Sequence, residues 1–115
     1  MTISEFEIKR WERELQIFLE NRRPPPHIRD KLDFGYRIKD QSAELFEIRP
    51  GWNNPSEKIE NSIAKTTYVK SKKIWKVFWM RADLKWHAYE PKPTVGSIEE
   101  FLELVSEDEY GCFFG

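Results

Sequence analysis

The apolar residues near the start of the chain recur with the spacing of an α-helix. Four of them fall on one helical stripe: Ile8, Trp11, Leu15 and Phe18. Ser4 and Glu7 have the spacing of a capping box, and three prolines begin at Pro24, where a helix cannot continue. The pattern predicts a helix over residues 5–21. We interpret the basic segment 22–31 as a helix stop and rigid connector, with a polyproline ligand for a partner as the alternative.

The middle of the chain changes to the period of two that is typical of half-buried strands. Leu32, Phe34, Tyr36 and Ile38 alternate with residues that are charged or glycine. With the runs that follow, the pattern predicts five strands, over residues 32–39, 43–49, 63–70, 73–81 and 85–90. Residues 50–61 begin PGWNNP, which is rich in turn formers, and are expected to form a loop. The other connections are short, so neighbouring strands should pair antiparallel.

A second capping box, formed by Ser97 and Glu100, predicts a second helix over residues 98–106. Its apolar stripe should pack on the sheet, and the first helix should cover another part of it. The expected fold class is therefore α+β, an antiparallel sheet of about five strands with an N-terminal and a C-terminal helix (α-β-β-β-β-β-α). One domain is expected to span residues 1–115, without a linker or tag.

Composition constrains the setting of this domain. The longest apolar run is residues 77–80, far below the ~20 residues that span a bilayer, and no signal peptide is recognisable. Cys112 is the only cysteine, which excludes an intramolecular disulfide. These features favour a cytoplasmic location without a membrane partner. The net charge of -1 argues against obligate nucleic-acid binding.

Charge is distributed unevenly along the chain. Residues 65–92 contain eight Lys or Arg and two acidic residues, a net of +6, whereas residues 97–115 contain six acidic and no basic residues. The acidic residues of the second helix could lie beside Lys72 and Lys73 and neutralise them. The alternative, which we favour, is a solvated helix face formed by Glu99, Glu100, Glu103 and Glu107.

Basic and aromatic residues gather in the segment KIWKVFWMRADLKWHAYEP, residues 73–91. A candidate binding surface consists of Lys70, Lys72, Lys73, Trp75, Trp79 and Arg81. Exposed tryptophans would stack on nucleic-acid bases, whereas buried ones would form the core of a central strand that is covered on both sides. We favour the core interpretation, because exposing several tryptophans is difficult for a domain of ordinary stability.

Catalytic motifs are absent from the sequence. It contains no glycine-rich phosphate loop, nucleophile elbow or HExxH motif, and His27, His87 and Cys112 do not have the spacing of metal ligands. We therefore predict a protein that is not an enzyme and uses no cofactor or metal. The aromatic residues of the C-terminus, Tyr110, Phe113 and Phe114, are expected to fold back onto the domain, with an exposed docking tail as the alternative.

Several stretches together resemble a known family. They are PPPHIRDKLDFGYRI, ELFEIRPGW, IAKTTYVKSKKIWKVFWMRADLKWHAYEP and the ending EDEYGCFFG. From about Pro24 to Gly115 the chain resembles the small bacterial domain-of-unknown-function family 3024. The resemblance implies a free-standing bacterial α+β protein with no established activity, and it supplies no site residues.

Two functional hypotheses follow. The first is a non-enzymatic protein-binding or adaptor module whose protein partner is unknown. The alternative is a weak binder of single-stranded nucleic acid. It would use Lys70, Lys72, Lys73 and Arg81 for phosphates and Trp75 or Trp79 for stacking.

Overall fold

The N-terminal helix begins and ends close to the residues that its caps predict. The computed structural model describes residues 4–114. Helix α1 spans Glu5–Arg22, and the Ser4 hydroxyl accepts a hydrogen bond from the Glu7 N–H at 3.2 Å. At the other end the Arg23 N–H donates to the Leu19 carbonyl at 2.7 Å, directly before the prolines. The predicted helix and its stop are therefore confirmed.

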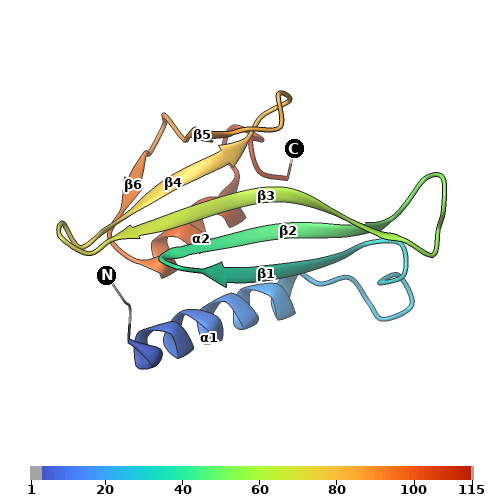
Figure 1. The fold of residues 1–115 in the computed structure, drawn as a ribbon, viewed down its shortest axis with the longest axis horizontal. Helices are drawn as coiled ribbons and strands as arrows, with labels where there is room; N and C mark the ends of the chain where they lie inside the picture. Colours follow the sequence, from blue (N-terminus) through green and yellow to red (C-terminus); the bar gives the residue numbers. More distant parts are fainter. Residues whose placement is uncertain (1–3, 115) are drawn as a thin grey trace.

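Six antiparallel strands form one sheet (Figure 1). Five neighbours lie in the order β1-β2-β3-β4-β5, and β6 pairs with β4 next to β5. The strands are β1 (Asp33–Lys39), β2 (Ser42–Pro50), β3 (Lys58–Val69), β4 (Ile74–Met80), β5 (Trp86–Ala88) and β6 (Thr94–Val95). Helix α2, Ile98–Glu107, follows, and its Ser97 cap accepts from the Glu100 N–H at 3.1 Å. The predicted α+β class is confirmed, with a short sixth strand added.

Two strands, β3 and β5, differ from their predicted ranges by more than one residue at an end. β3 begins at Lys58, because Ile48 pairs with Glu60 and Pro50 with Lys58, so the loop between β2 and β3 ends earlier than expected. A bulge lies in this strand at Ile63, where the register shifts between Leu45 and Phe46 of β2. β5 is shorter than predicted and comprises three residues.

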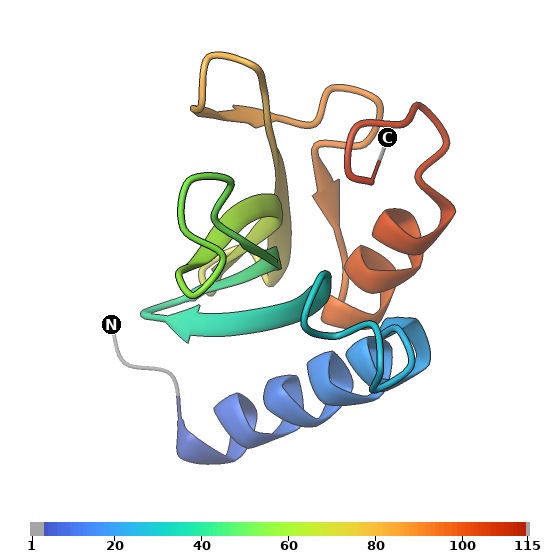
Figure 2. The same ribbon diagram turned by 90° about the vertical axis from the view of Figure 1, so that its right-hand side faces the viewer.

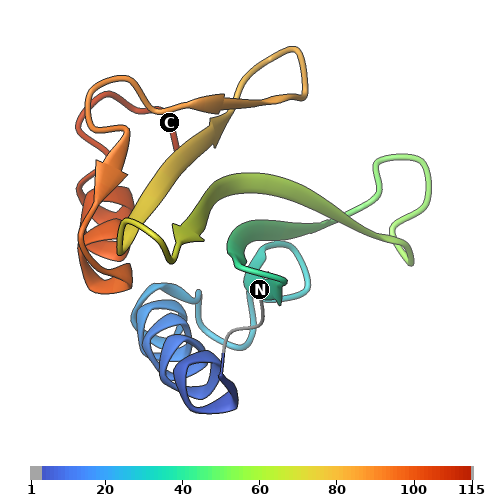
Figure 3. The same ribbon diagram turned by 60° about the vertical axis from the view of Figure 1, so that its left-hand side comes forward.

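Both helices lie on the same face of the sheet, as the two rotated views show (Figures 2 and 3). The core fills the space between them and the sheet, and it is built on rings. Trp11 of α1 packs edge-on against Trp75 of β4, with ring centroids 4.6 Å apart, and against Tyr68 of β3 at 5.7 Å. α2 adds Phe101 and Val105, which are completely buried.

The prediction that β4 is covered on both sides is wrong. Trp75 and Val77 face the helices and are buried, whereas Phe78 and Met80 point to the opposite face and are only half-buried. Neither helix covers that face (Figure 3). Neighbouring side chains shield it instead, so apolar residues on both sides of a strand need not indicate two covering layers.

The C-terminal segment folds back in part. The Asp108 carboxylate accepts hydrogen bonds from the N–H groups of Phe113 (2.9 Å) and Phe114 (2.8 Å). Phe113 packs on Tyr89 and is 7% exposed, and Phe114 lies edge-on to the ring of Phe34. Tyr110 is 62% exposed, so the prediction is wrong for this residue. It lies at the tip of the turn that the Asp108 carboxylate closes.

Candidate functional site

The residues of the predicted binding surface lie at opposite ends of β4. Lys70, Lys72 and Lys73 are exposed in the turn between β3 and β4, and Arg81 follows the far end of the strand. At about 3.3 Å per residue, the two ends are roughly 25 Å apart. These residues therefore do not form one continuous patch.

The two tryptophans of this set have different environments. Trp75 is 3% exposed and packs within the core, so its ring cannot stack on a ligand. Trp79 is half-buried at the border of the core, and the guanidinium of Arg81 lies 5.4 Å from its ring centroid. Of the predicted aromatic residues only Trp79 is accessible, and its partner there is Arg81.

The acidic helix does not neutralise the lysines of the β3–β4 turn. Glu99 pairs with Arg10 at 2.9 Å, and Glu100 lies 4.0 Å from Lys92. Among residues 4–114, no carboxylate lies within 4.0 Å of Lys72 or Lys73. The positive charge of this turn therefore remains uncompensated.

The histidine and cysteine side chains offer no evident metal site. Within the described part of the chain, no group of three or more His, Cys, Asp or Glu residues could hold a metal ion. His87 pairs with Asp83 at 2.8 Å, and this hydrogen bond lowers the pKa of the Asp83 carboxyl. Burial, together with the charge of Asp108, raises the pKa of the Cys112 thiol, which is therefore neutral rather than an activated thiolate.

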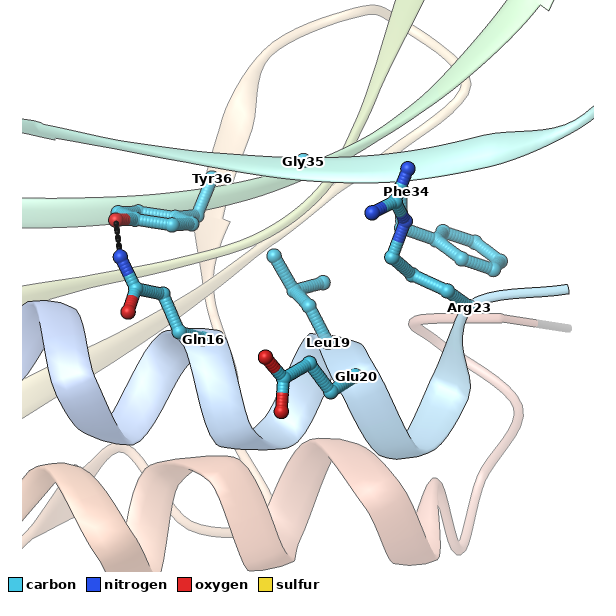
Figure 4. A pocket seen from close by; sticks show the side chains of 7 residues that line it. All are labelled: Gln16, Leu19, Glu20, Arg23, Phe34, Gly35 and Tyr36. Carbon is cyan, nitrogen blue, oxygen red and sulfur yellow. Dashed lines mark hydrogen bonds between the residues drawn. The ribbon is translucent and has the colours of Figure 1, made fainter. Parts of the chain in front are cut away.

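A groove lies between α1 and β1, next to an edge of the sheet (Figure 4). Its volume is about 350 Å³. The side chains of Leu19, Phe34 and Tyr36 and the backbone of Gly35 form an apolar wall. We call this feature the α1–β1 groove.

Polar side chains from α1 flank the same groove. The Gln16 amide donates to the Tyr36 hydroxyl at 3.1 Å, which ties the middle of the helix to β1 (Figure 4). Arg23 closes one end by donating two hydrogen bonds to the Asp33 carboxylate, at 2.8 and 2.6 Å. The hydrogen bonds from Arg23 lower the pKa of the Asp33 carboxyl. Glu20 has no cation within 4.0 Å among the described residues, so its charge is free.

The free edge of β1 runs along this groove. A two-residue turn joins β1 to β2, and it makes Lys39 and Ser42 the closing hydrogen-bonded pair. The backbone groups of Arg37 and Gly35 then also point to β2, whereas those of Ile38 and Tyr36 point away from the sheet. Among the described residues, no backbone group forms a hydrogen bond with the outward N–H and C=O groups of Ile38 and Tyr36.

Sequence reasoning did not find this groove. It identified the alternation of Phe34, Tyr36 and Ile38 and predicted the first helix. It could not identify β1 as the edge of the sheet, because pairing order is not encoded in local periodicity. The Gln16–Tyr36 contact spans 20 residues and likewise leaves no local signal.

Comparison with known proteins gives a family but no function. Among the described residues, no helix is long and apolar enough to cross a membrane. No curated protein and no solved structure shows a significant match to the chain. A family model described as domain of unknown function (DUF3024) matches residues 3–115. The chain therefore belongs to the DUF3024 family.

Proposed function

We propose that this protein is a non-enzymatic, cytoplasmic protein-binding module that takes an extended segment of a partner into the α1–β1 groove. The segment would pair with the free edge of β1 as an additional antiparallel strand. The main support for this proposal is the seven-residue edge strand β1, whose outward N–H and C=O groups lie beside a groove of about 350 Å³. Unpaired strand edges are templates for such pairing, and a groove beside them selects alternate side chains.

The side chains that line the groove indicate which kind of segment would fit. Alternate side chains of an added strand would enter between β1 and α1, where Leu19 and the rings of Phe34 and Tyr36 favour apolar groups. The free carboxylate of Glu20 favours a basic residue at one of these positions. The proposed ligand is therefore an extended, largely apolar segment with one lysine or arginine.

A second copy of the chain is a poorer occupant of this edge. Antiparallel strands lie about 4.8 Å apart, whereas packed helices need roughly 8–10 Å between their axes. α1 lies along β1 (Figure 1), so a continuous sheet formed through β1 of two copies would bring their α1 helices into conflict. A partner segment without a helix at its side avoids this conflict.

The test selects ligands from a displayed library of randomised ten-residue peptides and measures their affinity for two variants. Ile38→Pro removes an outward N–H group, and proline is tolerated at strand edges, whereas Ile38→Val retains the N–H group and similar packing. Loss of the hydrogen bond and the added ring should weaken binding about tenfold in Ile38→Pro. Selected peptides should also protect the Tyr36 and Ile38 amides from hydrogen exchange. Equal affinity of both variants, or a library that yields no ligand, would count against the proposal.

A second candidate function, weak binding of single-stranded nucleic acid, is favoured by a different observation. On the sheet face that no helix covers, the Lys65 ammonium lies 5.7 Å from the ring centroid of Phe78 and 5.8 Å from that of Trp86. A cation beside half-buried rings is a feature of sheet surfaces that bind bases. Binding of an oligothymidylate should fall steeply as salt rises and should weaken in Lys65→Gln. Affinity that is independent of salt would exclude this candidate.

A further inference from the structure

A second pocket lies between β5 and the C-terminal segment. Its volume is about 330 Å³. Six of the residues that line it carry polar or aromatic side chains: Trp79, Arg81, His87, Tyr89, Glu90 and Cys112. We call it the β5 pocket. It is separate from the α1–β1 groove and shares no lining residue with it.

Tyr89 is the unusual residue of the β5 pocket. Only 1% of its surface is exposed, and its ring packs on Phe113 with centroids 4.9 Å apart. No hydrogen bond to its hydroxyl occurs among residues 4–114, although no fully buried polar side-chain atom there lacks a partner. The hydroxyl is therefore not fully buried, and Tyr89 lines the pocket. Burial raises the pKa of Tyr89, with a further contribution from Cys112, so the hydroxyl retains its proton and can donate it.

Arg81 brings a free positive charge to the same pocket. Its guanidinium lies over the ring of Trp79, 5.4 Å from the centroid, and no carboxylate of the described residues lies within 4.0 Å of it. Stacking on the ring restricts the side chain without using its N–H donors. A guanidinium beside Trp79 and a hydroxyl that has no partner among the described residues thus border one cavity.

We propose that the β5 pocket binds a small organic monocarboxylate. Planar carboxylates match the fork of N–H donors of arginine, and the Tyr89 hydroxyl supplies another donor. Ala88, Pro91 and Cys112 also line the pocket and offer apolar surface to the rest of the ligand. Glu90 also lines the pocket, and its charge disfavours ligands with a second carboxylate.

Phenylacetate is a suitable probe, because it combines one carboxylate with an apolar ring small enough for the cavity. Its neutral counterpart phenylacetamide has nearly the same shape. Binding is measured on the full chain from ¹H–¹⁵N chemical-shift changes, including the Trp79 indole signal. We expect saturable binding of phenylacetate in the millimolar range, as is usual for a ligand of this size, and at least tenfold weaker binding of phenylacetamide.

Two variants test the assigned donors. Tyr89→Phe removes only the hydroxyl and should weaken phenylacetate binding about fivefold, while the melting temperature stays the same or rises, because no hydrogen bond within the protein is lost. Arg81→Gln should weaken binding at least about tenfold. Arg13→Gln, an exposed position on α1, serves as the control and should leave the affinity unchanged.

Three results would overturn the proposal. They are an absence of saturable shifts, equal affinities for phenylacetate and phenylacetamide, and unchanged phenylacetate affinity in both Tyr89→Phe and Arg81→Gln.

Discussion

The guanidinium of Arg23, at the C-cap of α1, forms a bidentate pair with the carboxylate of Asp33, the first residue of β1. The side chain of Asp33 is 17% exposed, and its Oδ1 atom also accepts the N–H of Phe34 at 2.8 Å. This pair joins the end of the helix to the start of the edge strand. It therefore fixes the spacing of the α1–β1 groove at one end.

Asp33→Asn should destabilise the protein at neutral pH by about 1 kcal/mol, because the pair is partly exposed and the asparagine can still accept the Phe34 N–H. The pKa of Asp33 is lowered in the folded state, chiefly by the Arg23 hydrogen bond. The stabilising contribution is therefore complete above the unfolded-state pKa of about 3.9 and is lost as the pH falls through the folded-state value.

Urea unfolding of wild type and Asp33→Asn, from neutral to acid pH, checks this prediction. The difference between their free energies of unfolding should shrink as the acid limit is approached. Asp30→Asn, at an exposed position nearby, should show little difference at any pH. A difference between wild type and Asp33→Asn that is independent of pH would mean that the charge of Asp33 is not the source of the stabilisation.

Because the C-terminal segment folds back, substitution of two of its aromatic residues should have very different effects on stability. Phe113→Ala should cost about 3 kcal/mol or more, because this ring is buried against Tyr89, which it would leave partly uncovered. Tyr110→Ala removes a ring that is 62% exposed and should change stability by less than about 0.5 kcal/mol. Equal effects in thermal or urea unfolding would mean that the segment is not packed as the structure has it.

The environments of the tryptophans predict how the chain responds to acrylamide. Trp52, in the loop between β2 and β3, is 88% exposed, whereas Trp75 is 3% exposed. Trp52→Phe should therefore remove most of the readily quenched fluorescence, and Trp75→Phe should leave it in place. If Trp75→Phe also removes readily quenched emission, the core interpretation of β4 fails and stacking by this ring becomes possible.

Local patterns predicted the elements of the fold more reliably than the relations between them. The capping boxes of Ser4 and Ser97 mark both helix starts correctly, because capping depends on residues only three apart. The additional residues of β3 escaped detection because KIENS has no apolar alternation, yet its backbone pairs with β2. Backbone pairing needs no particular side chains, so such extensions are visible only in three dimensions.

The candidate sites depend on relations that the sequence does not show. Alternation correctly puts Trp75 and Trp79 on one face of β4, but it cannot reveal that the core covers the first ring more completely than the second. The proximity of Tyr89 to Cys112 arises because the C-terminal segment returns to β5. The edge position of β1 likewise follows from the order of the strands. Short connections predict which strands are neighbours, but they do not predict which strands lie at the edges of the sheet.

A close approach at Gly35 of β1 yields the last prediction. The ring of Phe46 lies close to this residue, and a Cβ atom there would be 2.7 Å from Cε2 and 2.8 Å from Cζ of the ring. The guanidinium of Arg37 lies 4.6 Å from the centroid of the same ring, so the ring is confined and 7% of Phe46 is exposed. Gly35→Ala must therefore displace the ring, at a cost of about 1–3 kcal/mol.

Gly96→Ala is the matched control for this substitution. Its added Cβ would approach only the Glu100 carboxylate, at 3.2 Å from Oε1, and that flexible side chain can move aside. It should change the free energy of unfolding by less than about 0.5 kcal/mol. Gly35→Ala should also weaken any peptide selected for the α1–β1 groove, since displacement of Phe46 disturbs the edge strand from its outer face. Full stability of Gly35→Ala would show that Phe46 is free to move and that β1 is less rigid than a strand-pairing edge requires.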